Sequence, residues 1–486
     1  MAAFTTVLAF DLGASTGRAI RAVYDGERLQ WKEIHRFDNI PAVENGHLRW
    51  NMEALLGEIR IAIQKAGKTD SLAFDTWGVD FGLLDADGKL LEDPVHYRDE
   101  RTKDWPRRVA QKIEFHSLYA RTGNQILEIN TLFQLLALQE EQPELLRRAK
   151  HLLFMPDLLA VMLGAELTWE RSIASTSQMW NPVAGTWDLE LLRQMGMDPG
   201  VFGAMTDSGS IIGALPDGTK IIAVAGHDTQ CAVAAMPVEE GESAVFLSCG
   251  TWSLIGCELE TPILTKESCD SGLSNEYGAN GRINYLKNII GLWLIQESRR
   301  EYARQGEEYS FGELAKLADE AEAFHCFIDP DAPEFVAPGN IPERIQKFCR
   351  RTGQPVPETV GETVRCIYES LALKYRYALE QLEGMTGKNF TTLHILGGGA
   401  NAGLLCQMTA DACRLMVKAG PVEATALGNI LIQLKALHAI HDIDKGRRLI
   451  AVTEKITEYA PQNRKKDAWE NAYHRFVTMM QMEKER

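Results

Sequence analysis

The sequence predicts an α/β protein built from two halves of similar plan, and three observations lead to this prediction. Short apolar runs with the character of strands alternate with longer stretches of helical periodicity. A strand, a turn and a second strand open the chain, and the same order recurs from Ala244. A chain of 486 residues, 45% of them hydrophobic, can bury the cores of two or more domains.

The first half opens with an expected hairpin. Residues 7–10 form an apolar run, residues 11–17 have the composition of a turn, and residues 18–23 alternate in polarity. Apolar residues at helical spacing predict a helix over 52–66, and a strand is expected to begin at 72–74. Further helices are expected at about 105–120, 131–149 and 156–163, and a further strand at 221–225. This alternation is typical of an α/β domain.

The second half repeats this plan after a polar, turn-rich stretch at 237–242, which is the expected domain boundary. We therefore predict domains at 1–238 and 239–486, with the two halves facing one another. A second hairpin is expected over 244–257, with its turn at 248–251. A long amphipathic helix at about 361–383, a strand at 394–396 and a helix at about 402–413 complete the prediction.

The composition limits the possible partners. Lys and Arg total 51 against 67 Asp and Glu, a net charge of −16, whereas a protein that binds nucleic acid usually has the opposite sign. An acidic protein that holds phosphate must use backbone N–H groups, helix N-termini and a metal ion. No apolar run approaches the roughly 20 residues of a membrane span, and the apolar N-terminus lacks the basic start of a signal peptide. We therefore expect a soluble, cytoplasmic protein with no nucleic-acid or membrane partner.

The cysteines favour a reduced compartment. There are nine, all at Cys231 or later, with no C-x-x-C pair and no cluster at zinc-site spacing. Cys349 and Cys366 flank a proline-containing loop and could approach each other, but buried free thiols are more typical of a protein of this size. We predict no structural disulfide.

The turn of the first hairpin has the residues of a phosphate site. Glycines let a backbone approach phosphate closely, hydroxyls donate hydrogen bonds, and a carboxylate can hold Mg²⁺ through its waters. An ordinary hairpin turn explains the same residues, but Thr251 in the second hairpin favours a pair of turns that hold one triphosphate. Gly67-Lys68-Thr69 resembles the end of a P-loop, yet Ala62 replaces its earlier glycine and the segment ends a helix. The candidate residues are Asp11, Gly13, Ala14, Ser15, Thr16, Gly17 and Thr251.

Three consecutive glycines, Gly397, Gly398 and Gly399, stand between an expected strand and an expected helix. The third glycine of a dinucleotide fingerprint is absent, because Ala402 occupies its place, and this disfavours hydride transfer. The triplet suits the close approach of a flat ring or a ribose to the backbone. A plain tight turn without a ligand is the alternative.

The segment His227-Asp228-Thr229 follows an apolar strand and precedes a run of small residues, so a helix should begin just after the carboxylate. Asp228 there could accept a proton from a bound hydroxyl, or it could serve only as a helix cap. The His-Asp pair also resembles those of metal phosphohydrolases, but the further His and Asp ligands of such a site do not stand out.

The segment from Asp75 to Phe81 combines two carboxylates, an indole and a glycine at a strand end. An indole can cover the C–H face of a polyhydroxylated ligand, and an aspartate can accept hydrogen bonds from its hydroxyls. Trp77 and Asp80 are therefore candidate ligand residues. A core tryptophan beside solvated acids is the alternative.

Taken together, these segments resemble the FGGY carbohydrate kinases of the actin-like ATPase superfamily, and most closely the rhamnulokinase branch. The resemblance spans nearly the whole chain. The segments that carry it are 9–18, 75–81, Tyr97-Arg98-Asp99 with Arg101-Thr102, Met155-Pro156-Asp157, His227-Asp228-Thr229, 248–254, 287–296 and 420–429.

The resemblance implies two ribonuclease-H-like (actin-like ATPase) domains with ATP and Mg²⁺ in an active-site cleft between them. Asp228 would be the general base, and Asp11 would hold the hydrated Mg²⁺. The phosphates would bind Gly13 to Gly17 and Thr251, and the nucleoside would bind Asn288, Gln296 and Gly397 to Gly399. The sugar pocket would consist of Trp77, Gly78, Asp80, His227 and Thr229.

The implied reaction is ATP-dependent phosphorylation of O1 of L-rhamnulose, a step of L-rhamnose catabolism, by a monomer or small homo-oligomer. Another ketose or polyol kinase of the family, acting on fuculose, xylulose or glycerol, is one alternative. A non-catalytic actin-like nucleotide-binding protein is another. Two segments depart from the family pattern: Gln230 and Cys231 stand where small residues are usual, and Ala400-Asn401-Ala402 is less polar than in close relatives.

Overall fold

The computed structural model describes residues 4–239 and 241–484. The chain divides into two compact units, which are described here one at a time. The first contains Met1–Pro237, Glu258–Tyr285 and Ala424–Thr453, and the second contains Val238–Cys257, Leu286–Glu423 and Glu454–Arg486. The predicted domains at 1–238 and 239–486 stay a prediction, because units of close contact and folding domains need not coincide.

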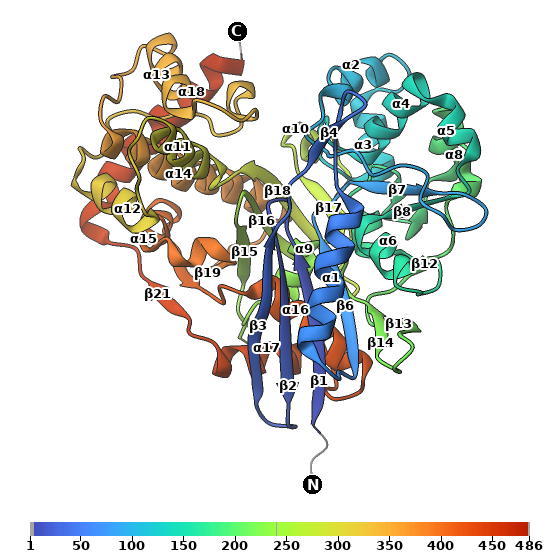
Figure 1. Ribbon diagram of the computed structural model, residues 1–486. Coiled ribbons are helices and arrows are strands. Elements are labelled where there is room, and N and C mark those ends of the chain that lie inside the picture. The colour runs from blue at the N-terminus through green and yellow to red at the C-terminus, as the bar shows by residue number, and fades with distance from the viewer. Residues whose placement is uncertain (1–3, 240, 485–486) are drawn as a thin grey trace. The chain divides into compact units, whose positions relative to one another are not determined.

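A mixed six-stranded sheet forms the centre of the first unit, in the order β13-β14-β6-β1-β2-β3. In Figure 1 its strands β1, β2, β3 and β6 are blue, and β13 and β14 are green. β1 pairs antiparallel with β2 and parallel with β6, and β6 pairs parallel with β14. The carboxyl ends of β1, β6 and β14 therefore lie at one edge of the sheet. The bounds are β1 Thr5–Leu12, β2 Thr16–Tyr24, β3 Leu29–Asp38, β6 Ser71–Thr76, β13 Ser210–Ala214 and β14 Lys220–Ala223.

Helices cover both faces of this sheet, and alternate residues of β1 face them. Leu8 and Phe10 belong to the core that includes α1 (Met52–Ala66), which begins at the predicted residue and is capped by Asn51. Val7 and Ala9 belong to a second core formed with α9 (Asp228–Ala234) and α16 (Ala424–Ala436). These two helices pack so closely that a Cβ on Gly428 would lie 1.8 Å from the Cys231 carbonyl oxygen. The α/β class predicted from the sequence is confirmed.

The rest of the first unit surrounds the strand ends. The helix expected at 131–149 is interrupted at Gln142, because Pro143 has no N–H to continue it. The stretch 105–120 likewise holds two helices instead of one. The elements are β4 Ala42–Glu44, β5 His47–Arg49, β7 Phe81–Leu84, α2 Trp105–Ala110, α3 Phe115–Thr122, α4 Thr131–Glu141, α5 Pro143–Arg148, β8 His151–Phe154, α6 Met155–Met162, β9 Trp169–Glu170, α7 Arg171–Ala174, β10 Trp180–Asn181, β11 Thr186–Trp187, α8 Leu189–Gln194, β12 Met205–Thr206, α10 Lys266–Asp270, β17 Ser274–Tyr277 and α17 Ile443–Thr453.

In the second unit, β15 (Ala244–Cys249) pairs antiparallel with β16 (Trp252–Leu259), which is the predicted second hairpin. β15 also pairs parallel with β19 (Thr392–Leu396), so the turns that follow these two strands lie at the same sheet edge. The long helix α14 (Val360–Thr386) has a capping box at Thr359 and ends at Gly387. The other elements are β18 Ile283–Ile290, α11 Trp293–Arg304, α12 Phe311–Glu320, α13 Ile341–Arg351, α15 Gly403–Cys413, β20 Met416–Ala419, β21 Thr457–Tyr459 and α18 Lys466–Lys484.

The cysteines are free thiols in the structure, and all but Cys269 are buried. Cys349 and Cys366 do approach each other, and the Sγ atoms of Cys326, Cys349 and Cys366 lie within 4.8 Å of one another. Within residues 4–239 and 241–484, none of the helices has the length and hydrophobicity needed to span a bilayer.

Candidate active site

The ends of neighbouring strands in the first unit bring carboxylates together. Asp11, near the end of β1, is opposite Asp75 of β6 in the parallel register. The guanidinium of Arg18, on β2, forms an ion pair with Asp11. Asp75 is fully buried, and its Oδ2 accepts a hydrogen bond of 2.7 Å from Asn429 Nδ2. In the described part of the chain, its Oδ1 has no hydrogen-bond partner.

The paired carboxylates fit a hard divalent cation. Burial raises the pKa of Asp75 well above its usual value, and the nearby Asp11 and Asp228 add to this rise. Mg²⁺ prefers carboxylate and water oxygens. The orphaned buried Oδ1 of Asp75 and the mostly buried side chain of Asp11 are donors of this kind. The donor set thus agrees with the ligand expected for Asp11.

Glu170 fixes the chain before the candidate base. Its Oε2 accepts hydrogen bonds from Gly226 N at 2.9 Å and Ile173 N at 3.0 Å. It also accepts one from Ser172 Oγ at 2.6 Å, and Ser208 Oγ donates to Oε1 at 2.6 Å. Gly226 leads directly to His227, which bridges to Thr76 of β6. The buried Glu170 therefore sets where α9 begins.

The helix expected just after Asp228 is present, and it begins at Asp228 itself, the first residue of α9. Thr229 N donates to its Oδ1 at 2.6 Å, and Thr229 Oγ1 donates to the same atom at 3.2 Å. No described residue donates a hydrogen bond to Oδ2, and 33% of the side chain is exposed. Burial raises the pKa of Asp228, His227 opposes the rise, and Asp11 adds to it. Such a carboxylate has one oxygen held and one available for proton transfer.

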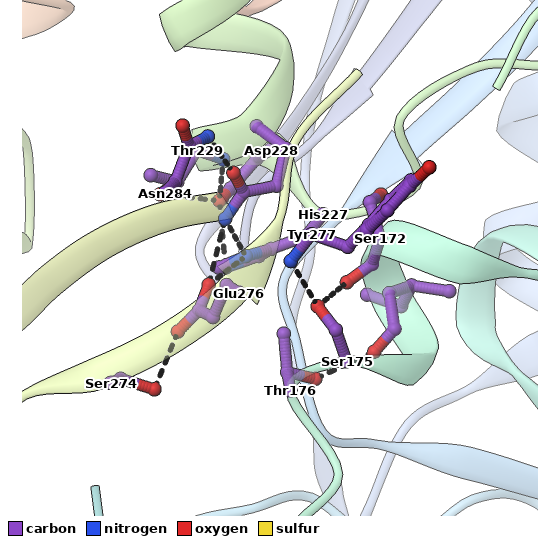
Figure 2. A network of polar contacts seen from close by, with 12 residues as sticks. Ser172, Ser175, Thr176, His227, Asp228, Thr229, Ser274, Glu276, Tyr277 and Asn284 are labelled. Carbon is purple, nitrogen blue, oxygen red and sulfur yellow. Dashed lines mark hydrogen bonds and ion pairs between the residues drawn. The ribbon is translucent and has the colours of Figure 1, made fainter. Parts of the chain in front are cut away.

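His227 lies between two carboxylates (Figure 2). Its Nδ1 is 3.1 Å from Glu276 Oε2, and its Nε2 is 3.4 Å from Asp228 Oδ1. Glu276, on β17, also accepts a 2.7 Å hydrogen bond from Gln230 Nε2. Burial lowers the pKa of His227, but Glu276 and then Asp228 more than offset this, so the net change is upward.

The segment after β6 is held from inside the protein. Asp80 is 1% exposed, and its Oδ2 accepts hydrogen bonds from Trp50 Nε1 at 2.7 Å, Trp77 Nε1 at 2.9 Å and Tyr97 N at 3.2 Å. Gln134 Nε2 donates to Oδ1 at 3.0 Å. Burial raises the pKa of Asp80 to about 6 against these four donors. In this structure Asp80 thus positions the Trp77 indole, and the four donors occupy both of its oxygens.

The turn between Trp77 and Asp80 is strained and close to the base. Val79 has φ +67°, which is unfavourable for a β-branched residue, and Thr131 Oγ1 donates to its carbonyl at 2.7 Å. A Cβ on Gly78 would lie 3.5 Å from the His227 ring. The structure therefore brings Gly78, His227 and Thr229 of the predicted sugar residues together with the predicted base, Asp228.

The candidate phosphate turn of the first unit is closed by a hydrogen bond of 2.9 Å from Gly13 N to Thr16 O. Asn39, which directly follows β3, supports this turn, because its side chain donates to Gly13 O at 3.1 Å and its backbone N donates to Ser15 O at 3.0 Å. Packing explains the glycine at position 17, because a Cβ there would lie 2.2 Å from the Phe37 ring. Ser15 is exposed, with Ala14 and Thr16 partly so.

In the second unit the predicted nucleotide residues gather at one sheet edge. Thr251 Oγ1 donates to Gln296 Oε1 at 3.4 Å, and Asn288 lies on β18. Gly397 has φ +81°, and a Cβ on Gly399 would lie 2.2 Å from Cys249 Sγ. No heavy atom lies within 4 Å of a Cβ built on Gly398. Backbone conformation requires glycine at 397 and close packing requires it at 399, whereas Gly398 leaves space for a ligand.

Sequence reasoning missed Glu276, Glu170 and Asn39. Each supports another residue, and none stands in a motif that would identify it. Gln230, noted as a departure from the family, is fully buried and bonded to Glu276 and Asn284. Its neighbour Cys231 is also buried, donates to Ala225 O at 3.1 Å, and has a pKa raised well above the usual value by burial. The position of Cys231 is that of an inert core thiol.

Comparisons with known proteins identify the family and the fold. The FGGY family of carbohydrate kinases matches through its N-terminal domain at residues 6–236 and its C-terminal domain at residues 245–437. A gluconate kinase from Lactobacillus acidophilus has a TM-score of 0.80 and 15% identity, covering 99% of this chain and 98% of that one. A xylulose kinase from the same organism, with ligand bound, has a TM-score of 0.78 and 16% identity. The glycerol kinase of Plasmodium falciparum with ADP has a TM-score of 0.76 and 14% identity. Each of these two matches covers 98% of this chain and 98% of the other. These likenesses show the two-domain actin-like ATPase fold. With both family domains matched over most of its length, the chain belongs to the FGGY family of carbohydrate kinases, which phosphorylate sugars with ATP.

Proposed function

We propose that the protein transfers the γ-phosphoryl group of ATP to O1 of a ketose, and that this ketose is L-rhamnulose. The observation that carries the reaction type is Asp228, with Oδ1 held by Thr229 and Oδ2 available. The choice of sugar rests on the segments 75–81 and 227–229, which resemble the rhamnulokinase branch. Because the three structural relatives named above are at most 16% identical to this chain, they support the fold and leave the sugar to experiment.

In the proposed reaction, Oδ2 of Asp228 takes the proton from the sugar O1 hydroxyl. O1 forms a bond to the γ-phosphorus, and the bond from that phosphorus to the bridging oxygen of ADP breaks. The products are the sugar 1-phosphate and ADP, with the proton on Asp228 until solvent removes it. Phosphoryl transfer needs alignment and charge neutralisation more than covalent help, so a carboxylate that accepts the proton late suffices.

The proposed phosphate residues differ in what they can offer. Ser15, Thr16 and the backbone of 13–17 supply neutral donors in the first unit, and Thr251 supplies a hydroxyl in the second. Mg²⁺ held by Asp11 would neutralise charge on the phosphates when it is bound. An acidic protein can thus bind ATP without a basic surface, as its net charge of −16 requires. The nucleoside is proposed to lie near Asn288, Gln296 and the open position of Gly398.

The sugar is proposed to bind beside Gly78, His227 and Thr229. Gly78 leaves room next to the His227 ring, where any larger residue would project. Trp77 is 5% exposed and is anchored by Asp80. We infer that Trp77 shapes the wall of this site and that Asp80 acts through it.

A coupled ADP-release assay over a panel of L-rhamnulose, L-fuculose, D-xylulose, gluconate and glycerol tests the proposal. We expect the highest kcat/KM for L-rhamnulose and a phosphorylated product whose mass and NMR spectrum place phosphate on O1. Asp228→Asn should lose at least about 100-fold in kcat while retaining ATP binding. A clear preference for another member of the panel would replace the sugar and keep the family chemistry. Full activity of Asp228→Asn would overturn the assigned base.

A further inference from the structure

The candidate base has a neighbour whose role the sequence does not indicate. Glu276 lies on β17, its side chain is 5% exposed, and its Oε2 faces His227 Nδ1 at 3.1 Å. On the other side of the same ring, Nε2 is 3.4 Å from Asp228 Oδ1. The three groups form a line of carboxylate, imidazole and carboxylate, which Figure 2 shows. Resting on the proposed function, we propose that Glu276 is a positioning residue that holds His227 as an imidazolium facing the Asp228 base.

The other contacts of Glu276 are neutral. Gln230 Nε2 donates to Oε2 at 2.7 Å, and Ser274 Oγ donates to Oε1 at 3.4 Å. A buried carboxylate is costly unless it is paired and hydrogen-bonded. The ion pair that the structure gives Glu276 is with His227. A proton on both ring nitrogens lets His227 donate to Glu276 through Nδ1 and face Asp228 through Nε2.

The backbone on both sides of this line is fixed. Tyr277 N, next to Glu276, donates to Ser175 Oγ at 2.8 Å, and that hydroxyl donates to Ser172 O at 2.7 Å. The chain before His227 is held by Glu170 through Gly226 N. Both backbones are therefore tied to Glu170 and Ser175, the two residues that flank α7, so the scaffold holds the backbones of Glu276 and His227 in place.

The charged groups around these three side chains favour the protonated form of His227 and disfavour the ionised form of Asp228. His227 is faced by Glu276, Asp228 and Glu170, whose negative charges favour its protonated form against the cost of burial. Asp228 is surrounded by Asp11 and Asp75, whose negative charges disfavour its ionised form, and by His227, which favours it. A protonated His227 thus keeps Asp228 ionised beside two other carboxylates. Loss of the Glu276 charge should lower the pKa of His227 and, through it, raise the pKa of Asp228.

The first test measures kinetics in the full-length enzyme. Glu276→Gln keeps the shape and removes the charge, and we expect kcat to fall about tenfold or more, since an aligned base contributes roughly 10²–10⁴-fold in all. KM for the sugar should change less than threefold. The acid limb of the kcat profile should move to higher pH, and Glu276→Asp should restore part of both properties. Glu258→Gln is the matched control, because Glu258 is also a buried carboxylate but pairs with Arg447; its pH profile should not move.

The second test needs no substrate. The His227 C2–H resonance is identified in the proton NMR spectrum by its loss in His227→Gln, and its pH midpoint is measured in the wild type and in Glu276→Gln. We expect a wild-type midpoint above that of a free imidazole and a midpoint lower by about one unit or more in the variant. A neutral His227 at pH 7 in the wild type would overturn the proposal, even if Glu276→Gln failed to fold.

The two proposals fail differently. If no sugar of the panel is phosphorylated, the proposed function falls, and the NMR midpoints still decide whether Glu276 protonates His227. If a sugar is phosphorylated and Glu276→Gln leaves kcat and its pH profile unchanged, the function stands and Glu276 has no positioning role. A fall in thermal stability without a change in the profile would likewise count against positioning.

Discussion

Asp11 and Asp75 lie opposite each other on the parallel strands β1 and β6, with Asp11 paired to Arg18 and Asp75 to Asn429. Two buried carboxylates at adjacent positions repel each other unless a proton or a cation lies between them. The pKa of Asp75 is raised, mainly by burial and then by Asp11, which corresponds to a proton shared by the pair. A divalent cation would replace that proton.

This pair predicts how activity depends on Mg²⁺. Asp11→Asn should raise the Mg²⁺ concentration for half-maximal ADP release by about 10- to 100-fold, because it removes a carboxylate that is expected to hold the hydrated ion. Asp75→Asn should have a smaller effect, since Asp75 is fully buried and bonded to Asn429. The measurement is a Mg²⁺ titration at saturating ATP and sugar. Equal Mg²⁺ requirements of Asp11→Asn and the wild type would contradict the assignment of Asp11.

Asp80 predicts a pH dependence of stability. Its pKa is about 6 in the folded protein against an ordinary value of 3.8, because burial outweighs four hydrogen-bond donors. Because the pKa is higher in the folded protein, the contribution of Asp80 to folding stability is fully present below pH 3.8 and is lost as the pH rises through 6. The difference is roughly 3 kcal/mol. The side chain of Asp80→Asn cannot ionise. The variant should therefore become more stable relative to the wild type as the pH rises from 4 to 7.

The test is urea unfolding of the wild type, Asp80→Asn and Asp87→Asn across this pH range. Asp87 is exposed in a nearby turn and serves as the control. Its stability difference from the wild type should stay nearly constant with pH. A constant difference for Asp80→Asn as well would show that folding does not raise the pKa of Asp80.

Local patterns predicted the parts of this molecule that depend on nearby residues. The first hairpin and the helix over 52–66 follow from apolar spacing and turn residues, and the structure confirms them. The helix expected just after Asp228 is also present and begins at Asp228 itself. Pro143 could have shown where the helix at 131–149 breaks. The α/β class followed from the alternation of such segments.

Long-range partners could not be predicted in this way. Glu276 meets His227 across 49 positions, and Asn429 meets Asp75 across 354. That Asp80 contacts a sugar stays a prediction, but the sequence could not show that Trp50, Trp77, Tyr97 and Gln134 all donate hydrogen bonds to its carboxylate. Whether a polar side chain faces a ligand or the core depends on which distant elements pack around it, and periodicity does not carry that information.

The glycine triplet predicts two different effects of the same substitution. Gly399→Ala should destabilise the second unit, since its Cβ would lie 2.2 Å from Cys249 Sγ. Gly398→Ala meets no atom within 4 Å and should leave the melting temperature nearly unchanged. If the nucleoside lies against this residue, KM for ATP should rise about 3- to 30-fold with little change in KM for the sugar. Scanning calorimetry and initial-rate kinetics separate the two variants, and an unchanged KM for ATP in Gly398→Ala would remove this glycine from the nucleotide site.

Glu170 predicts a link between stability and catalysis. It accepts hydrogen bonds from Gly226 N, Ile173 N and Ser172 Oγ in the buried turn before His227. Glu170→Ala leaves these three donors without an acceptor, which should cost roughly 3–9 kcal/mol at about 1–3 kcal/mol per buried donor. Because the turn also places Asp228, kcat should fall at temperatures where the variant is still folded.

Ser208→Ala is the matched control for Glu170, because Ser208 Oγ bonds only the other carboxylate oxygen, Oε1, at 2.6 Å. It should cost about 1 kcal/mol and leave kcat within twofold. Unfolding curves and single-turnover rates at 15 °C check both variants. If Glu170→Ala lost stability but kept the wild-type single-turnover rate, the turn at Gly226 would be unnecessary for placing Asp228, and the alignment of the base would have to come from Thr229 and His227 alone.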